Sequence, residues 1–309
     1  MNWGYKRAMQ RNVIRRLQNS ILSDKYKFYA ILCIELILWP FLWLRQWFVR
    51  SYGISHKDRL IRAAVKSRKV TVCVHEWGGY PMKRSKTIKD GATFECGLKY
   101  QLDRFAAKEG VNLIVTMSDA SKHDCLESIK SRVRVVEVDN KGMDFSGYAS
   151  VYSMVKDEPN QYIVLSNSSV NSVQGEFLQG YIDYMEQNPD VGLLGVSYCT
   201  CMWQTLVRNN FTPHLQSFFL LTTTQVLNEV VALNKGKFPG KGINHKLLLI
   251  RQGEIKLSRL VQKLGYRLAV VNPQNGIPFK FTDYRHWKLP KGDIRQLLSD
   301  PNKITPISI

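Results

Sequence analysis

Residues 133–148 read VRVVEVDNKGMDFSGY, and this stretch decides the fold of the chain. Its first six residues are rich in valine, which is typical of a strand. A polar segment with two glycines follows, and residues 148–155 then have the composition of a helix. A strand, a polar turn and a helix in this order form the repeating unit of a parallel sheet.

The same order of elements recurs on both sides of this stretch. Apolar runs predict four further strands, at Val70–Val74, Val111–Met117, Tyr162–Leu165 and Val191–Val196. Helical patterns lie between them, at Phe94–Lys108, Ala120–Ser131 and Gly175–Gln187. Strands that alternate with helices predict an α/β fold whose mostly parallel sheet is flanked by helices.

Polar segments rich in Gly, Asn, Asp and Ser follow four of these strands. They are residues 75–79 (HEWGG), 118–121 (SDAS), 139–148 (DNKGMDFSGY) and 166–170 (SNSSV). These residues are ordinary turn formers, so one such segment indicates only a turn. In open α/β sheets, however, ligands bind beyond the carboxyl ends of the strands. Four segments at corresponding positions therefore predict a shared cleft.

Composition bounds the class of protein. The 309 residues carry 44 Lys and Arg against 25 Asp and Glu, a net charge of +19, and 44% of them are apolar. These proportions exclude a disordered or collagen-like chain. Six cysteines are too few for a disulfide scaffold, and no secretory signal peptide is recognised. We expect reduced thiols and a cytosolic or cytosol-facing protein.

Most of the positive charge lies near the N-terminus. Residues 1–69 hold fifteen Lys and Arg against three Asp and Glu, a net +12. They include the most apolar stretch, Phe28–Leu44, which at 17 residues is at the short limit for a bilayer-spanning helix. Glu35 lies inside this stretch, and Trp39, Trp43 and Trp47 lie near its end. Trp beside Lys and Arg is typical of a membrane interface.

An acid inside a span is costly, and positive charge on both flanks gives no orientation. We therefore expect a helix inserted part-way into one leaflet, with its basic flanks on an anionic membrane surface. A bilayer span and a buried core helix are the alternatives. Nucleic-acid binding would require a basic face on the folded domain, so we expect no nucleic-acid partner.

Several enzyme signatures are absent from the sequence. Without Gly-x-Gly-x-x-Gly or a Walker loop, a dinucleotide oxidoreductase and a P-loop kinase are disfavoured. Gly-x-Ser-x-Gly is missing as well, which disfavours a hydrolase. Cys199-x-Cys201 has no second pair at metal spacing, so no zinc site is predicted.

An ordered set of motifs carries a family resemblance. The set comprises residues 140–148 (NKGMDFSGY), 162–169 (YIVLSNSS), 214–219 (HLQSFF), 253–258 (GEIKLS), 265–266 (GY) and 276–280 (GIPFK). It resembles the GT-A-fold glycosyltransferases that use nucleotide sugars. More narrowly, it resembles the rhamnan synthesis F family of polysaccharide biosynthesis glycosyltransferases. The resemblance covers about residues 69–280.

The resemblance implies a binding site for the sugar donor. It would consist of His75, Asp119, Asn140, Gly142, Asp144, Ser166, Asn167 and Ser168. In the GT-A fold an Asp after the second strand holds the base or ribose, and Asp119 matches it. Glycine at 142 lets the backbone approach a ligand closely, and Asp144 is able to accept hydrogen bonds from sugar hydroxyls. The alternative for Asp144 is an N-cap of the following helix.

The metal requirement stays open at this stage. Many GT-A enzymes end the fourth strand with Asp-x-Asp, which holds Mn²⁺ or Mg²⁺ against the diphosphate, because hard cations prefer carboxylate oxygens. Here residues 166–168 read Ser-Asn-Ser. Either Asp144 helps to hold a metal, or the enzyme uses cations such as Lys141, Arg251 or Lys256 on the leaving diphosphate.

Glu254 is the candidate catalytic base. It opens a predicted helix, Glu254–Leu264, and in inverting GT-A enzymes an acid at such a helix start takes the proton of the acceptor hydroxyl. The alternative is an acid that the helix dipole favours at an N-terminus. The resemblance also places His214, Gln216 and Lys256 against the acceptor or the diphosphate.

Together these features predict three segments: a membrane-anchoring segment (1–57), a GT-A-like domain (58–287), and a short helix with a loose tail (288–309). The expected enzyme transfers a hexose or deoxyhexose from a nucleoside-diphosphate-sugar to a lipid-linked or growing surface polysaccharide, of the O-antigen, lipopolysaccharide or capsule type. It would be peripheral or monotopic at the cytoplasmic face of the inner membrane. Because Asp-x-Asp is missing, the alternative is a non-catalytic GT-A-like scaffold in a polysaccharide assembly complex.

Overall fold

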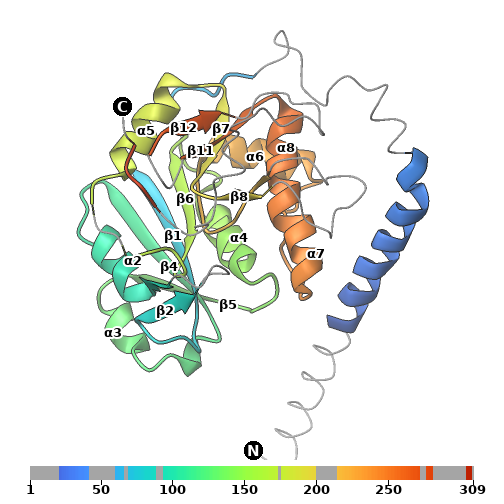
Figure 1. Cartoon of the computed structure of the whole chain (residues 1–309). Helices are drawn as coiled ribbons and strands as arrows, with labels where there is room; N and C mark the ends of the chain where they lie inside the picture. Colours follow the sequence, from blue (N-terminus) through green and yellow to red (C-terminus); the bar gives the residue numbers. More distant parts are fainter. Residues whose placement is uncertain are drawn as a thin grey trace, which may run out of the picture.

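The computed structural model describes residues 21–41, 60–65, 69–87, 93–172, 175–199, 214–271, 276–280 and 304–307. An eight-stranded mixed sheet lies at the centre, in the strand order β12-β11-β7-β10-β6-β1-β4-β5 (Figure 1). Its strands are β1 Val70–Trp77, β4 Val111–Ser118, β5 Arg134–Val138, β6 Tyr162–Asn167, β7 Val191–Gly195, β10 Phe219–Thr223, β11 Arg267–Val271 and β12 Pro278–Lys280.

The sheet is mostly parallel, as the sequence predicted. β1 is parallel to β4 and β6, β4 is parallel to β5, and β7 is parallel to β11. β10 is antiparallel to β6 and β7, and β12 is antiparallel to β11. The registers align Trp77 with Ser118 and His75 with Asn167. The polar segments that follow β1, β4 and β6 therefore meet at one edge of the sheet.

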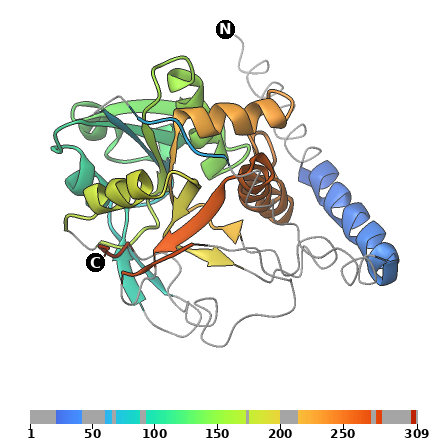
Figure 2. The same cartoon turned by 90° about the horizontal axis from the view of Figure 1, so that it is seen from above.

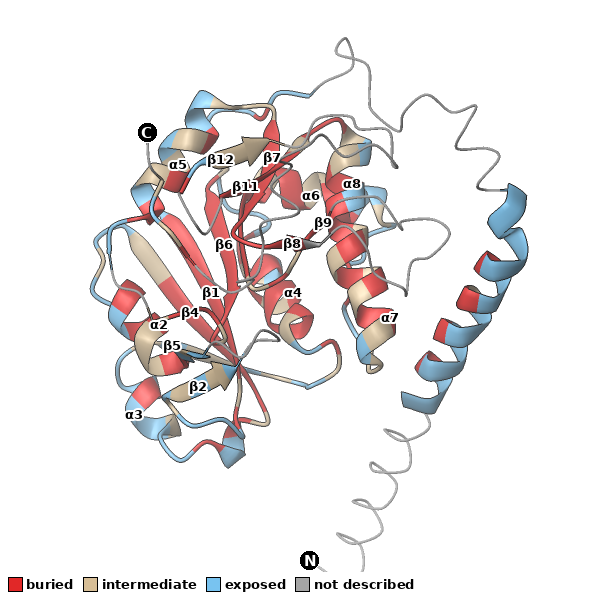
Figure 3. Cartoon of the chain, in the orientation of Figure 1, coloured by how far each residue is buried: buried red, intermediate tan, exposed pale blue. Residues whose placement is uncertain are grey.

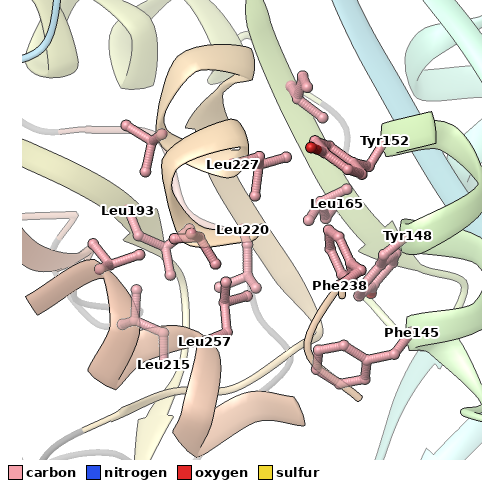
Figure 4. Close-up of a cluster of buried hydrophobic side chains, with 14 of the residues drawn as sticks. Phe145, Tyr148, Tyr152, Leu165, Leu193, Leu215, Leu220, Leu227, Phe238 and Leu257 are labelled. Atoms are coloured by element: carbon pink, nitrogen blue, oxygen red, sulfur yellow. The ribbon is translucent and has the colours of Figure 1, made fainter. Parts of the chain in front are cut away.

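Helices cover both faces of the sheet. They are α2 Leu98–Phe105, α3 Leu126–Lys130, α4 Asp144–Val155, α5 Leu178–Gln187, α6 Thr224–Leu233, α7 Lys246–Ile250 and α8 Lys256–Leu264, with the short 3-10 helix η2 Ala120–Lys122. One core lies under α4, α6 and α8 and includes Tyr148, Leu227 and Leu257 (Figure 4). The other lies under α2 and α5 and includes Leu102 and Tyr181. Because both faces are covered, the central strands are buried (Figure 3), and their residues are mostly apolar.

Two short antiparallel ladders accompany the main sheet. One pairs β2 Arg84–Thr87 with β3 Thr93–Cys96, and the other pairs β8 Tyr198–Cys199 with β9 His214–Leu215. The expected helix from Phe94 is wrong in its first residues, because these pair with β2. Gly97 separates β3 from α2 with a φ of +129°, a conformation that favours glycine.

Two helices also begin earlier than expected. α4 begins at Asp144, and the helix expected to open at Glu254 continues from α7 through a π-helical turn, η4 Arg251–Ile255, into α8. The prediction that Glu254 opens a helix is therefore wrong, because the apolar run of α7 already establishes the helix before it. The dipole of a helix start does not account for this acid. Single π-turns are rare and occur frequently at functional sites.

Residues 21–41 form a helix that lies beside the α7–α8 segment (Figure 2). Asp24, Phe28, Leu32 and Glu35 are buried and share one stripe at helical spacing. The remaining faces are largely exposed (Figure 3). Of the helices in the described ranges, none combines the length and the apolar character that crossing a bilayer requires. Trp43, Trp47 and the predicted boundary after residue 57 lie outside the described residues.

The buried stripe is held by three kinds of contact. Phe28 and Leu32 pack against Leu248 of α7. The backbone N–H of Asn244 donates to Asp24 Oδ2 at 2.9 Å. Glu35 forms a buried ion pair with Arg251. The acid that made a spanning helix unfavourable thus serves as a docking contact.

The C-terminal residues 304–307 are held to the domain. Ile304 is buried, its N–H donates to Asn171 Oδ1 at 3.0 Å, and Tyr181 donates to the carbonyl of Thr305 at 2.6 Å. For these residues the expected loose tail is wrong, because an apolar side chain and paired backbone groups fix them. The predicted short helix, residues 288–303 and the boundary after residue 287 lie outside the described residues.

Candidate functional site

The turn before α4 brings Asp144 to the polar edge of the sheet. Gly142 has a φ of +102°, and a Cβ there would lie 3.0 Å from the carbonyl oxygen of Gly240. Met143 has a φ of 47°, which is sparsely populated for a non-glycine residue and is typical of functional loops. Met143, and not Asp144, occupies the cap position of α4. The carboxylate Oδ2 of Asp144 instead accepts a hydrogen bond from Asn167 Nδ2 at 2.7 Å.

The end of β6 supplies the polar groups opposite this turn. Ser166, Asn167 and Ser168 are all buried. Ser166 Oγ donates to the carbonyl of Phe218 at 3.0 Å, and Asn167 Oδ1 accepts from the N–H of Ser169 at 3.0 Å. These contacts fix the amide of Asn167 so that its Nδ2 points to Asp144. Asn167 therefore connects the buried end of β6 to Asp144.

Glu254 lies on the π-turn and is held from the strand side. Its Oε1 accepts hydrogen bonds from Ser217 Oγ at 2.8 Å and from the Ser217 N–H at 3.4 Å. The residue is partly exposed. Burial raises the pKa of Glu254 to about 7, although the hydrogen bonds from Ser217 oppose this shift. A carboxyl group with a pKa near neutrality is suited to general base catalysis.

Glycine packing brings Glu254 close to Asp144. A Cβ at Gly253 would lie 2.8 Å from the ring of Phe145, so the π-turn rests directly on the first turn of α4. Asp144 precedes Phe145 and Glu254 follows Gly253. The charge of Asp144 contributes to the raised pKa of Glu254. Burial raises the pKa of Tyr148, and the charges of Asp144 and Glu254 both raise it further. Two carboxylates from distant parts of the sequence thus lie near each other.

A second group of contacts surrounds Asp119 at the end of β4. Trp77 Nε1 donates to Asp119 Oδ2 at 2.9 Å, and Lys122 Nζ lies 3.1 Å from the same oxygen. The hydrogen bond from Trp77 is the main reason that the pKa of Asp119 is lowered. The ring of Trp77 contacts Tyr80 edge to face at 4.9 Å between centroids. An exposed tyrosine, an indole and a carboxylate at one edge are suited to a nucleoside.

The sequence reasoning missed the β2–β3 ladder, which lies over this edge. Arg84 Nη2 donates to Ser168 Oγ at 2.7 Å, and Arg84 Nη1 pairs with Glu76 at 3.4 Å. The Arg84 guanidinium also lies 4.1 Å from the Tyr80 ring centroid. Farther along the same strand, Lys86 Nζ lies 5.2 Å from the ring centroid of Phe218. The alternation of basic and small polar residues at 84–87 was the available signal for this strand.

Other predicted residues lie next to the residues that bind the two acids: His75 pairs in register with Asn167 and is acted on by the charge of Asp144, and Gln216 precedes Ser217. His75 is buried beneath α4, where Nδ1 lies 3.1 Å from Thr116 Oγ1, and burial lowers its pKa. His214 is buried on β9, and Gln216 hydrogen bonds with Ser197. Their roles toward ligands stay predictions.

The cations proposed for the diphosphate are also distributed differently. Arg251 is paired with Glu35. The pKa of Lys256 is lowered by burial and then by the charges of Lys235 and Arg259, so its charged neighbours are basic. Asn140 is exposed in the loop before α4, and its carbonyl accepts from the Met143 N–H at 3.4 Å. Lys86 is a basic side chain that does lie toward Asp144: burial lowers the pKa of Lys86, and the charge of Asp144 opposes this shift.

A divalent cation at this edge would need several hard oxygen ligands close together. The described part of the chain contains no group of three or more His, Cys, Asp and Glu side chains that could hold a metal ion. Oδ2 of Asp144 already accepts a hydrogen bond from Asn167. The described residues at this edge therefore do not make up a Mg²⁺ or Mn²⁺ site.

A cavity of about 400 Å³ lies at the opposite edge of the sheet, where β1, β4 and β6 begin. Val70, Val111 and Tyr162 line it together with Lys108 and Glu176, which form an ion pair at 2.6 Å. Because it faces the amino ends of the parallel strands, this cavity is separate from the site of Asp144 and Glu254.

Comparison with known proteins gives a likeness in fold. No family model and no curated protein match the chain. A 4-diphosphocytidyl-2C-methyl-D-erythritol synthase is 15% identical with a TM-score of 0.40, over 76% of this chain and 98% of that protein. A glucosyl-3-phosphoglycerate synthase from Mycobacterium tuberculosis, in complex with Mn²⁺, UDP-glucose and glycerol 3-phosphate, is 14% identical with a TM-score of 0.39, over 64% and 68%.

A CMP:2-keto-3-deoxy-manno-octonic acid synthetase complexed with CTP is 10% identical with a TM-score of 0.36, over 53% of this chain and 78% of that protein. All three TM-scores are below 0.5, so these matches carry no argument about the reaction of this chain. They also give no support to the rhamnan synthesis F family in particular, and that resemblance stays a prediction.

Proposed function

We propose that this protein is a glycosyltransferase that moves a sugar from a nucleoside-diphosphate-sugar to a hydroxyl group of a glycan acceptor. The observation that carries the proposal is the pair of Asp144 and Glu254, brought together by the packing of Gly253 on Phe145. Asp144 and Asn167 would bind the donor sugar, and Asp119 with Trp77 would bind the nucleoside. Glu254 is partly exposed and would face the acceptor.

The proposed reaction is a single displacement. Glu254 removes the proton of the acceptor hydroxyl, and the oxygen attacks the anomeric carbon of the donor. The bond between this carbon and the diphosphate oxygen breaks, and the nucleoside diphosphate leaves with the electron pair. One base on the acceptor side and a leaving group on the opposite side give inversion at the anomeric carbon.

The N-terminal helix supports a location at the membrane. Ile37 is 73% exposed and Phe41 is 71% exposed, on faces of the helix that turn away from α7. Lys25 and Lys27 are exposed on the same helix, and residues 1–69 carry a net +12. Apolar and basic side chains together favour the interface of an anionic bilayer. We propose a peripheral or monotopic position at the cytoplasmic face of the inner membrane, where a lipid-linked surface polysaccharide would be the acceptor.

Donor binding is tested by thermal unfolding of the full chain in detergent, with UDP, GDP, CDP, dTDP and their sugars, each with Mn²⁺, Mg²⁺ or EDTA. A ligand at a hundredfold excess over its Kd stabilises the folded state by ~2.7 kcal/mol, which raises Tm by a few degrees. We expect a shift with one nucleotide and transfer of its sugar to a polyprenyl-linked glycan. A shift without transfer in any acceptor series would favour the non-catalytic scaffold, and no shift at all would contradict donor binding.

Membrane binding is tested by co-sedimentation with vesicles that contain anionic or only zwitterionic lipids. We expect binding to the anionic vesicles that falls at least tenfold in the double variant Ile37→Ser, Phe41→Ser. Leu233→Ser, which changes an exposed leucine on α6, is the matched control. Equal binding of all three proteins would remove the membrane from the proposal and leave the transfer reaction standing.

A further inference from the structure

One face of strand β2 carries two basic side chains over the site. Side chains alternate between the two faces of a strand, so Arg84 and Lys86 share one face while Ser85 and Thr87 share the other. Arg84 and Lys86 are partly buried, whereas Ser85 and Thr87 are exposed. The basic face of β2 is therefore the one that turns toward the end of β6.

Arg84 fixes the position of this strand. Its guanidinium contacts Glu76 at the end of β1, Ser168 and Ser169 after β6, and the ring of Tyr80. Five donors in a planar fork suit a group that bridges several partners. These contacts occupy the guanidinium of Arg84, so it is not available to a ligand. They also fix the strand that carries Lys86, the next side chain on the same face.

Lys86 has a different environment from Arg84. Its ammonium lies over the ring of Phe218, and the carbonyl of Phe218 accepts hydrogen bonds from Ser166 Oγ and from the Asn167 N–H. Lys86 therefore contacts Phe218, and Phe218 in turn contacts Asn167, whose side chain is hydrogen-bonded to Asp144. None of the ion pairs among the described residues, with nitrogen and oxygen within 4.0 Å, includes Lys86. An ammonium that is partly dehydrated and has no paired carboxylate is suited to an anionic ligand.

We infer that Lys86 binds the diphosphate of the donor and receives its negative charge as the sugar leaves. This inference rests on the proposed function and adds the group that acts on the leaving side. When the bond between the anomeric carbon and the diphosphate oxygen breaks, the electron pair stays on that oxygen. A positioned ammonium stabilises the developing charge in the way that a carboxylate-bound metal ion does elsewhere. Lys86 would thus supply the positive charge at the end of β6, where Ser166-Asn167-Ser168 replaces the Asp-x-Asp motif that holds a metal ion in many GT-A enzymes.

The test compares binding of the nucleoside diphosphate and of the corresponding nucleoside, by calorimetry in EDTA on the full chain. For Lys86→Met we expect the diphosphate to bind at least tenfold more weakly and the nucleoside to bind within twofold of the unchanged protein. Lys86→Arg keeps the charge and should recover most of the affinity. Lys83→Met removes an exposed lysine whose ammonium lies over Tyr100, so it controls for net charge and should change neither affinity.

Each outcome decides one of the two proposals. If Lys86→Met binds the diphosphate as well as the unchanged protein does, the inference is overturned, while loss of transfer in Glu254→Gln would keep the proposed function. If Lys83→Met weakens binding as much as Lys86→Met does, the effect is one of overall charge and the inference is also overturned. If the unchanged protein binds no nucleoside diphosphate, the proposed function fails and the inference fails with it. Unchanged Tm values of the variants verify that they are folded.

Discussion

Glu76 at the end of β1 and Glu254 on the π-turn are acids at the same edge of the sheet, and burial raises the pKa of each to about 7. Their surroundings differ. Glu76 is only 1% exposed and is paired with Arg84, whereas Glu254 is partly exposed and is held by the hydroxyl and N–H of Ser217. A raised pKa alone therefore does not identify a catalytic acid or base. The group must also have a side open to a substrate.

This contrast assigns different roles to the two acids. Glu76 Oε1 accepts from the backbone N–H of Trp77 at 2.9 Å and lies 3.4 Å from Arg84 Nη1. It stabilises the position of β2. Glu254 is partly exposed, and the charge of Asp144 acts on it.

The largest expected effect comes from removing each carboxylate in turn. Glu254→Gln should lower the rate of transfer by ~10²–10⁴-fold, the usual contribution of a general base, and leave the Kd of the donor within about twofold. Glu76→Gln changes the same type of group and should leave the rate per folded molecule within about threefold. Single-turnover transfer and calorimetry measure the two quantities. Full activity of Glu254→Gln would end the assignment.

The pH dependence of transfer separates the two acids next. A base with a pKa of about 7 must be deprotonated to act, so kcat/KM should fall tenfold for each pH unit below 7, to about one hundredth at pH 5. Glu76→Gln should keep this acid limb, and the residual activity of Glu254→Gln should lack it. If the acid limb of kcat/KM were lost in Glu76→Gln and kept in Glu254→Gln, Glu76 would be the base and Glu254 the structural acid.

Arg84→Met tests the structural role of Glu76 through stability. It leaves a buried carboxylate without its cation, which should cost ~3 kcal/mol in the free energy of unfolding at pH 8. The pKa of Glu76 is raised in the folded state, so the folded protein binds more protons than the unfolded chain between about pH 4.5 and 7. The protonated form of Glu76 therefore adds to the free energy of unfolding at low pH, and this contribution is lost as the pH rises through 7. Urea unfolding should therefore find a smaller cost at pH 5.5, and an equal cost at both values would contradict the role.

Ser217→Ala should give the smallest effect. Loss of the hydroxyl removes a hydrogen bond that lowers the pKa of Glu254, so this pKa should rise. A bond to a charged group contributes ~1.5 kcal/mol, which corresponds to about one pH unit in the acid limb of kcat/KM. The rate above pH 9 should stay within about twofold, and Ser85→Ala on the outer face of β2 is the control. An acid limb that does not move would show that Ser217 does not act on Glu254.

Much of the fold was predictable because local patterns decide it. Continuous apolar runs located β1, β4, β6 and β7, since a strand buried on both faces must be largely apolar, and the valines of residues 133–138 located the edge strand β5. The same logic placed Asp119, Asp144 and Asn167 at one edge, because parallel strands end on the same side. The β2–β3 ladder was missed, since its partly exposed strands have no apolar run and its basic residues resemble a solvated loop.

The sequence by itself determined the alternation of strands and helices, the polar edge and the apolar N-terminal segment with its acid. Only the tertiary structure decided which distant residues these side chains contact. Glu35 faces Arg251, Lys86 comes to lie over Phe218, and Gly253 rests on Phe145 so that Glu254 approaches Asp144. The physical reason is range: hydrophobic periodicity is set by neighbours three or four positions away, whereas a charge or a hydrogen bond acts on whichever group the packed chain brings near it.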